Sequence, residues 1–106
     1  MKKFLPGNKT IKFPVRANWA ILEHNDSAQV KVLVGCPKKN IKLAVHRNKI
    51  KRLLREAYRL NKSPLISLCN EKNIKIGLCI IYIGNEIPNF EYIMQKVELL
   101  LSQVMN

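Results

Sequence analysis

Apolar residues recur at helical spacing between positions 43 and 62, although this segment is densely charged. Successive residues advance by about 100° around an α-helix. One arc of this wheel carries the apolar side chains Leu43, Ile50, Leu53, Leu54, Ala57 and Tyr58. The opposite arc carries Lys51, Arg52, Arg55, Arg59 and Lys62, with Lys49 at its edge. The pattern predicts a helix over 43–62 with one face in the core and one cationic face in solvent.

Three further apolar runs predict β-strands. Residues 15–23 begin after a proline, residues 29–36 alternate valines with other side chains, and residues 74–83 are almost continuously apolar, which suits a central strand. Because residues 24–27 have turn chemistry, the first two runs are interpreted as an antiparallel hairpin.

The remaining segments complete the predicted architecture. Residues 1–12 are interpreted as an irregular lead-in, and residues 65–73 as a loop or one extra turn, because Pro64 disfavours continuation of the basic helix. Asn89 is expected to cap a last helix over 89–105. Its apolar side is Phe90, Ile93, Met94, Val97, Leu100, Leu101 and Val104. The prediction is one α+β domain over residues 1–106, a two-layer sandwich of a small mixed sheet with helices packed on it.

Charge narrows the class of partner. The chain has 19 Lys and Arg against 7 Asp and Glu, a formal net charge of +12, while 47% hydrophobic residues argue against a disordered chain. Ten of the cations fall within residues 38–62, where Glu56 is the only acid. Such clustering indicates a binding surface for a polyanion, with nucleic acid the leading candidate and an anionic membrane surface the second.

Other chemistry is sparse. Cys36, Cys69 and Cys79 have neither disulfide-framework nor zinc-site spacing, and Cys36 and Cys79 are expected to be small buried residues. No secretory signal or membrane span is evident, so a cytoplasmic location is expected. The acids are scattered, and no catalytic residue or metal ligand is expected; His46 near the helix start is assigned to phosphate contact or simple exposure.

One stretch carries a family resemblance. Lys38-Lys39, Ala44-Val45 and the run Arg47-Asn48-Lys49-Ile50-Lys51-Arg52-Leu53-Leu54-Arg55-Glu56-Ala57 closely resemble the protein subunit of bacterial ribonuclease P. The resemblance implies a polypeptide that assists a catalytic RNA in removing the 5′ leader from precursor transfer RNA. The RNA subunit and Mg²⁺ would perform the chemistry, and the protein itself would hold no cofactor. The implied partners are that RNA and precursor transfer RNA, with no membrane and no obligate protein partner evident.

The resemblance also implies site residues. Contact with the catalytic RNA is expected at Lys38, Lys39, Lys42, His46, Arg47, Asn48, Lys49 and Arg52. Contact with the leader is expected at Lys51, Arg55, Arg59 and Lys62. Trp19 is a further leader candidate, either as a stacking platform for an unpaired base or, alternatively, as a buried aromatic on a strand.

Three departures from the family pattern stand out. Lys49 stands where arginine is usual, and Cys36-Pro37 replaces a small apolar residue and serine. The family's usual N-terminal helix is expected to be absent or truncated. The resemblance further implies a left-handed strand-helix-strand crossover, as in a domain of a ribosomal protein, against the right-handed general rule.

Two other functions remain open from the sequence. The basic helix alone would suit a general structured-RNA-binding protein, of ribosomal or chaperone type, without a processing role. A protein that is itself a metal nuclease is the third reading, which the scattered acids disfavour.

Overall fold

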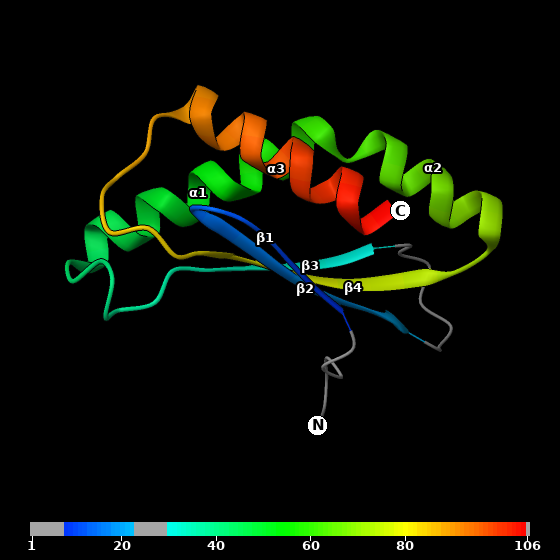
Figure 1. Ribbon diagram of the computed structural model, residues 1–106, viewed down its shortest axis with the longest axis horizontal. Coiled ribbons are helices and arrows are strands. Elements are labelled where there is room, and N and C mark those ends of the chain that lie inside the picture. The colour runs from blue at the N-terminus through cyan, green and yellow to red at the C-terminus, as the bar shows by residue number, and fades with distance from the viewer. Residues whose placement is uncertain (1–7, 23–29, 106) are drawn as a thin grey trace.

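The computed structural model describes residues 8–22 and 30–105, and these residues form four strands and three helices (Figure 1). The strands are β1 (Asn8–Lys12), β2 (Val15–Leu22), β3 (Val30–Gly35) and β4 (Lys75–Tyr82). The helices are α1 (Ala44–Asn61), α2 (Ser63–Lys72) and α3 (Phe90–Met105). The predicted central strand and the two predicted helices are therefore present, with each boundary within one residue of its predicted position.

The four strands form one mixed sheet in the order β1-β2-β4-β3. Strand β4 pairs antiparallel with β2 and parallel with β3. The predicted hairpin of residues 15–23 with 29–36 is therefore wrong, because β4 lies between these strands. The physical reason is that the nearly continuous apolar run of β4 favours a central position, where its backbone pairs with β2 along one edge and with β3 along the other. The predicted turn at 24–27 lies outside the described residues.

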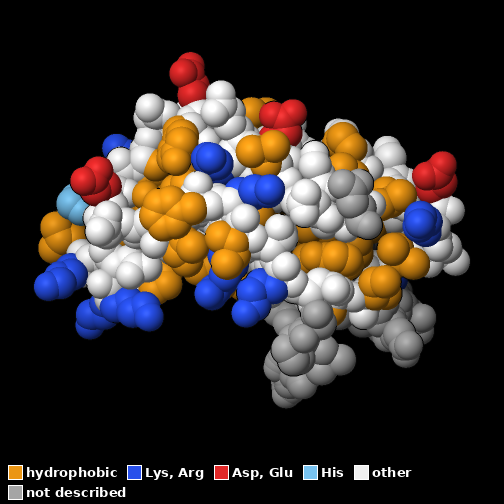
Figure 2. Space-filling model, viewed as in Figure 1, with side chains coloured by type: hydrophobic (Ala, Val, Ile, Leu, Met, Phe, Trp, Pro, Cys, Tyr) orange, Lys and Arg blue, Asp and Glu red, His pale blue; other side chains and the backbone are white. Residues whose placement is uncertain are grey.

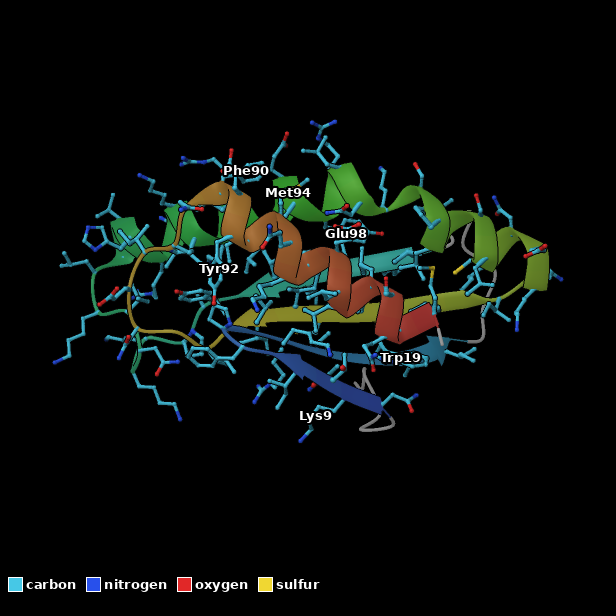
Figure 3. The ribbon with its side chains drawn as sticks, turned by 45° about the horizontal axis from the view of Figure 1, so that its top comes forward. Lys9, Trp19, Phe90, Tyr92, Met94 and Glu98 are labelled. Carbon is cyan, nitrogen blue, oxygen red and sulfur yellow. The ribbon has the colours of Figure 1, made fainter. Side chains whose placement is uncertain are left out.

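The described helices cover one face of the sheet and make a second layer (Figure 1). In Figure 3, β3 and β4 both run toward the left, the helices lie on the viewer's side of the sheet, and β4 lies below β3. A crossover of this geometry is left-handed. The two-layer α+β sandwich and its unusual handedness are thus as predicted.

Side chains alternate between the two faces along each strand, and those that point toward the helices fill the core between the two layers. Val15 and Ala17 of β2 are opposite Tyr82 and Ile80 of β4, and all four are buried. From α1, the buried side chains are Ile50, Leu54, Ala57 and Tyr58. From α3 they are Ile93, Val97, Leu100, Leu101 and Val104. Four of the six residues of the predicted apolar arc of α1 are thus buried, whereas Leu53 is only half-buried and Leu43 precedes the helix and is 57% exposed.

Helix α2 corrects the prediction of a loop or single extra turn at 65–73. Pro64 lies in the first turn of this helix, where proline is tolerated because its missing N–H would have no intrahelical partner. Leu65 and Cys69, four residues apart, are buried. The helix ends at Lys72 and is capped by Asn73, which has a left-handed backbone with φ of 56°. The Ile74 N–H donates to the Cys69 carbonyl at 3.0 Å. Proline therefore ends one helix and begins another here.

Strand β1 corrects part of the predicted irregular lead-in. Residues 8–12 pair antiparallel with β2 at the sheet edge, while residues 1–7 lie outside the described residues. The turn between β1 and β2 consists of Phe13 and Pro14, joined by a cis peptide bond. An edge strand with one apolar residue in five gives almost no periodic signal in the sequence.

The cysteines differ from the sequence prediction. Cys36 and Cys79 are partly exposed, whereas Cys69, which had no predicted role, is fully buried. Burial raises the pKa of the Cys36 thiol, against the opposing effect of the nearby Arg47 and Lys51 charges. Cys36 lies just past the end of β3, so the start of α1 packs close to that end of the sheet.

Candidate nucleic-acid interface

The cationic arc of α1 faces away from the core. The side chains of Lys49, Arg52, Arg55 and Arg59 are exposed, as are Asn48 and the following Lys62. Lys51 is half-buried at the flank of the helix, toward Cys36. Because the opposite stripe is fixed in the core, the exposed cations are carried on a rigid support and have lost much of their conformational freedom in folding.

The loop before α1 adds cations to the same end of the molecule. The Asn40 and Ile41 N–H groups donate to the Pro37 carbonyl, which forms a turn, and Ile41 is buried. Lys38, Lys39 and Lys42 therefore project from an anchored loop and are exposed. In Figure 2, blue side chains gather over this loop at the left end of the molecule. We call the surface formed by the loop and the outer arc of α1 the basic face.

Arg47 is held by the backbone of this loop. Its Nη1 donates to the carbonyl oxygens of Ile41 at 3.0 Å and Lys42 at 2.7 Å, and the side chain is half-buried. The guanidinium group therefore fixes the loop against the first turn of α1. Since only one of its nitrogens makes these two bonds, donors remain for a phosphate.

Arg59 has an acidic partner in the free protein. Its Nε donates to Glu56 Oε1 at 3.1 Å and its Nη2 to Oε2 at 2.6 Å. This hydrogen bond lowers the pKa of the Glu56 carboxyl. Because the pair is exposed at the helix surface, its net contribution to the stability of the fold is small, and a phosphate can compete for the arginine.

A shallow hollow lies at the start of α1. It has a volume of about 440 Å³ and is lined by Lys42, His46 and Leu43 on one side and by the loop of residues 85–87 on the other. His46 is half-buried in it. The predicted catalytic-RNA residues thus share one continuous region, which consists of the 38–42 loop and the first turns of α1.

Trp19 lies apart from the basic face. It belongs to β2, opposite Leu78 of β4, and is partly buried against the core beside the C-terminal end of α3 (Figure 3). This position matches the alternative of an aromatic packed on a strand. Base stacking by Trp19 stays a prediction.

The sheet face without helices carries polar residues that the sequence interpretation missed. Arg16 and Asn18 of β2 point to this face, and among the described residues Arg16 Nε and Asn18 Oδ1 are buried without a hydrogen-bond partner. Lys9 of the neighbouring β1 is paired in register with Asn18. The period-two alternation of Arg16 and Asn18 with Val15 and Ala17 was the available signal.

Two classes of site receive no support in the described part of the chain. Over residues 8–22 and 30–105, no three His, Cys, Asp or Glu side chains are grouped so that they could hold a metal ion. None of the described helices is long and apolar enough to cross a bilayer.

The fold and the basic face together define a small α+β protein of the RNA-binding class. Comparison with known proteins agrees. The family model described as Ribonuclease P matches residues 8–104. A ribonuclease P protein component of Porphyromonas gingivalis is 35% identical over 96 residues, covering 88% of this chain and 70% of the relative. One from Chlorobium phaeobacteroides is 39% identical over 85 residues, covering 74% of this chain and 58% of the relative. The chain belongs to the ribonuclease P protein family.

A solved structure agrees on the fold. The RNase P protein of Staphylococcus aureus superposes with a TM-score of 0.70, over 94% of this chain and 84% of that chain, at 21% sequence identity. This likeness supports the fold and not the individual contacts. The site residues given above therefore remain predictions.

Proposed function

We propose that this chain acts as the protein component of a ribonuclease P ribonucleoprotein, which binds the catalytic RNA and assists removal of the 5′ leader from precursor transfer RNA. The observation that carries the proposal is the basic face: an exposed cationic arc on a helix whose other side is buried, in a chain of this family. A general structured-RNA binder would share the charge but has no observation in its favour beyond it.

The basic face would act on the phosphate backbone. The residues proposed to bind the catalytic RNA are Lys38, Lys39, Lys42, His46, Arg47, Asn48, Lys49 and Arg52. Those proposed to approach the leader are Lys51, Arg55, Arg59 and Lys62. Each neutralised phosphate releases counterions, so affinity should fall steeply with salt concentration.

The chemistry would belong to the RNA. Mg²⁺ ions held by the RNA would supply a nucleophile and charge stabilisation at the scissile phosphate. The protein's contribution would be to replace part of the cation screening that two closely packed RNAs need. A helper of this kind should matter most when magnesium is scarce. The free thiols of this chain suit a reducing compartment, and we infer a cytoplasmic location.

Reconstitution tests this function. The folded protein is mixed with the catalytic RNA and precursor transfer RNA, and the rate of leader cleavage is measured over a magnesium series. The expected result is a large rate increase at low magnesium that shrinks as magnesium rises. Absence of any increase, with the protein shown to be folded, would refute the proposal. Recovery of ribosomal RNA and not the catalytic RNA with the protein from cells would favour the general binder.

A further inference from the structure

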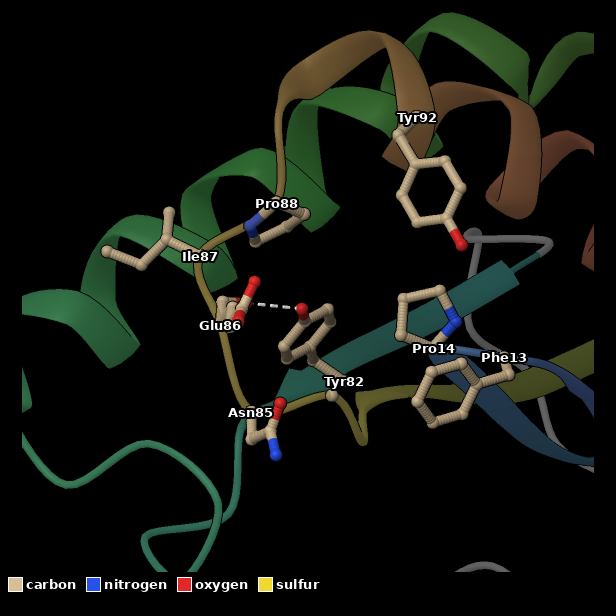
Figure 4. Close-up of a pocket in the computed structure, with 9 residues that line it drawn as sticks. Phe13, Pro14, Tyr82, Asn85, Glu86, Ile87, Pro88 and Tyr92 are labelled. Carbon is tan, nitrogen blue, oxygen red and sulfur yellow. Dashed lines mark hydrogen bonds between the residues drawn. The ribbon is translucent and has the colours of Figure 1, made fainter.

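An aromatic pocket lies at the end of the sheet where β1 turns into β2 and β4 leads into α3 (Figure 4). It has a volume of about 260 Å³. Its lining includes the rings of Phe13, Pro14, Tyr82, Pro88 and Tyr92. We call it the aromatic pocket. None of its residues belongs to the predicted RNA contacts.

The pocket is held by backbone and side-chain bonds from three segments. The Ile83 N–H donates to the Pro14 carbonyl at 2.7 Å, which ties the end of β4 to the β1–β2 turn. The Tyr82 hydroxyl donates to the Glu86 carbonyl and closes the loop that follows β4. Asn89 Oδ1 accepts from the Tyr92 N–H at 2.8 Å, so the predicted cap of α3 also fixes the position of Tyr92.

Gly84 is required for this arrangement. A Cβ atom at this position would lie 2.7 Å from Tyr82 Cζ, closer than real Cβ atoms approach, and 3.0 Å from Pro14 Cβ, a very tight contact. The loop can therefore pass between the tyrosine ring and the proline only without a side chain. The wall of the aromatic pocket is thus specified by sequence.

Two large rings at this pocket remain in solvent. Phe13 is 63% exposed and Tyr92 is 42% exposed, whereas the third aromatic ring of the pocket, Tyr82, is buried. Exposed aromatic rings beside a concave, apolar site are typical of surfaces that bind a ligand by stacking. The neighbouring Asn85 and Glu86 are exposed and supply hydrogen-bonding groups at the rim.

Cations lie near the aromatic pocket at two points. Lys96 Nζ is 5.3 Å from the centre of the Tyr92 ring. The loop of residues 85–87 forms one wall of the pocket and also one wall of the hollow that contains Lys42 and His46. The pocket therefore adjoins the basic face across a single loop. This charge favours a polyanion over a proline-rich peptide, the other ligand that aromatic and proline rings can accept.

We propose that the aromatic pocket accepts one unpaired nucleobase of an RNA strand whose phosphates are neutralised by Lys42 and Lys96. The inference rests on the proposed function for the identity of the RNA, but its chemistry requires only a base next to phosphates. Each base has a π face on which an aromatic side chain can stack, which contributes about 1–3 kcal/mol per base.

The test compares two single-stranded RNA oligomers by fluorescence anisotropy with the full chain. One is a short unstructured RNA, and the other has the same backbone but abasic riboses at its centre. The wild-type protein should bind the base-bearing oligomer about 5- to 150-fold more tightly than the abasic one, the ratio that one stacked base implies. Tyr92→Ala and Phe13→Ala should each remove most of this preference, and Tyr92→Phe should retain it.

Two control variants separate stacking from charge and from folding. Leu99→Ala truncates another exposed apolar residue of α3 outside the pocket and should leave the preference unchanged. Arg55→Ala should weaken both oligomers equally. Thermal melting of every variant shows whether a loss of preference reflects unfolding.

The outcomes distinguish this inference from the proposed function. Equal binding of the two oligomers by the wild type, or an unchanged preference in folded Tyr92→Ala and Phe13→Ala variants, would overturn the base pocket. If the wild type still stimulates the catalytic RNA in that case, the proposed function stands. Competition by a proline-rich peptide that depends on Tyr92, without any base preference, would reassign the pocket to a peptide and also overturn the inference.

Discussion

Helices α1 and α3 pack against each other over the same sheet, yet their outer faces differ. Each buries an apolar stripe, centred on Leu54 in α1 and on Leu100 in α3. The exposed side of α1 is cationic, whereas the exposed side of α3 carries acids and amides such as Glu91, Gln95 and Glu98. Packing requires only the buried stripe, so it does not account for the arginines of α1. The comparison separates what the fold needs from what binding needs.

The largest loss of stability should come from truncating a residue of the buried apolar stripe, and it should be similar in α1 and in α3. Leu54→Ala and Leu100→Ala each leave a cavity in the shared core, because both side chains are fully buried. We expect a loss of about 2–5 kcal/mol in the free energy of unfolding for each. Urea denaturation followed by circular dichroism measures it. A loss below about 1 kcal/mol at Leu54 would mean that α1 is not anchored as described.

The outer faces should behave differently from each other. Replacing Arg52, Arg55 and Arg59 together with alanine should leave the Tm nearly unchanged but weaken catalytic-RNA binding by about 10- to 100-fold and reduce the salt slope by about 2–3. The matched control replaces Gln95, Ser102 and Gln103, exposed polar residues of α3, with alanine. Titrations at several salt concentrations should show no change for that control. Equal weakening by both triple variants would remove the distinction between the faces.

A smaller effect on stability is expected at Arg47, a residue that contributes both to the fold of the loop and to the proposed RNA binding. Arg47→Lys keeps the charge but loses the geometry that binds the carbonyls of Ile41 and Lys42. We expect a loss of about 1–2 kcal/mol in the free energy of unfolding, together with weaker RNA binding. Arg52→Lys is the control, because Arg52 is exposed and makes neither of these bonds. Identical stability of the two variants would show that the Arg47 bonds do not stabilise the loop.

The smallest effect concerns the acid on the basic face. Glu56→Gln removes the partner of Arg59 and should raise RNA affinity about two- to threefold at low salt. Glu71→Gln makes the same charge change on α2 and should have less effect. Because Arg59 holds the pKa of the Glu56 carboxyl below its usual range, the pair is present at neutral pH and is lost as pH falls through that lowered pKa. Its stabilisation should therefore diminish only in acid, as pH-dependent melts can check.

Strong periodicity explains which parts of the fold were predictable. The basic helix, the closing helix with its Asn89 cap and the central strand each carry a long apolar pattern or a clear cap. Pairing of the strands could not be predicted in the same way. Pairing depends on which strand lies inside the sheet with a neighbour on each side, and the turn residues after β2 do not indicate which strand that is.

The candidate site was predictable in composition but not in geometry. Charge clustering and the family resemblance picked out the 38–62 region, which forms the loop before α1 and the whole of that helix. The sequence could not show that Arg47 binds its own loop or that Arg59 pairs with Glu56, because these depend on side-chain conformation. The aromatic pocket was missed because Phe13, Tyr82 and Tyr92 come from three separate segments.

Lysine footprinting tests most directly whether the outer arc of α1 and its preceding loop face RNA. The protein is acetylated with and without the catalytic RNA, and modification at each lysine is quantified by mass spectrometry. We expect strong protection at Lys38, Lys39, Lys42 and Lys49, and none at Lys72 at the end of α2. Protection at Lys72 equal to that at Lys49, or full reactivity of Lys49 in the bound complex, would contradict the assignment of this face.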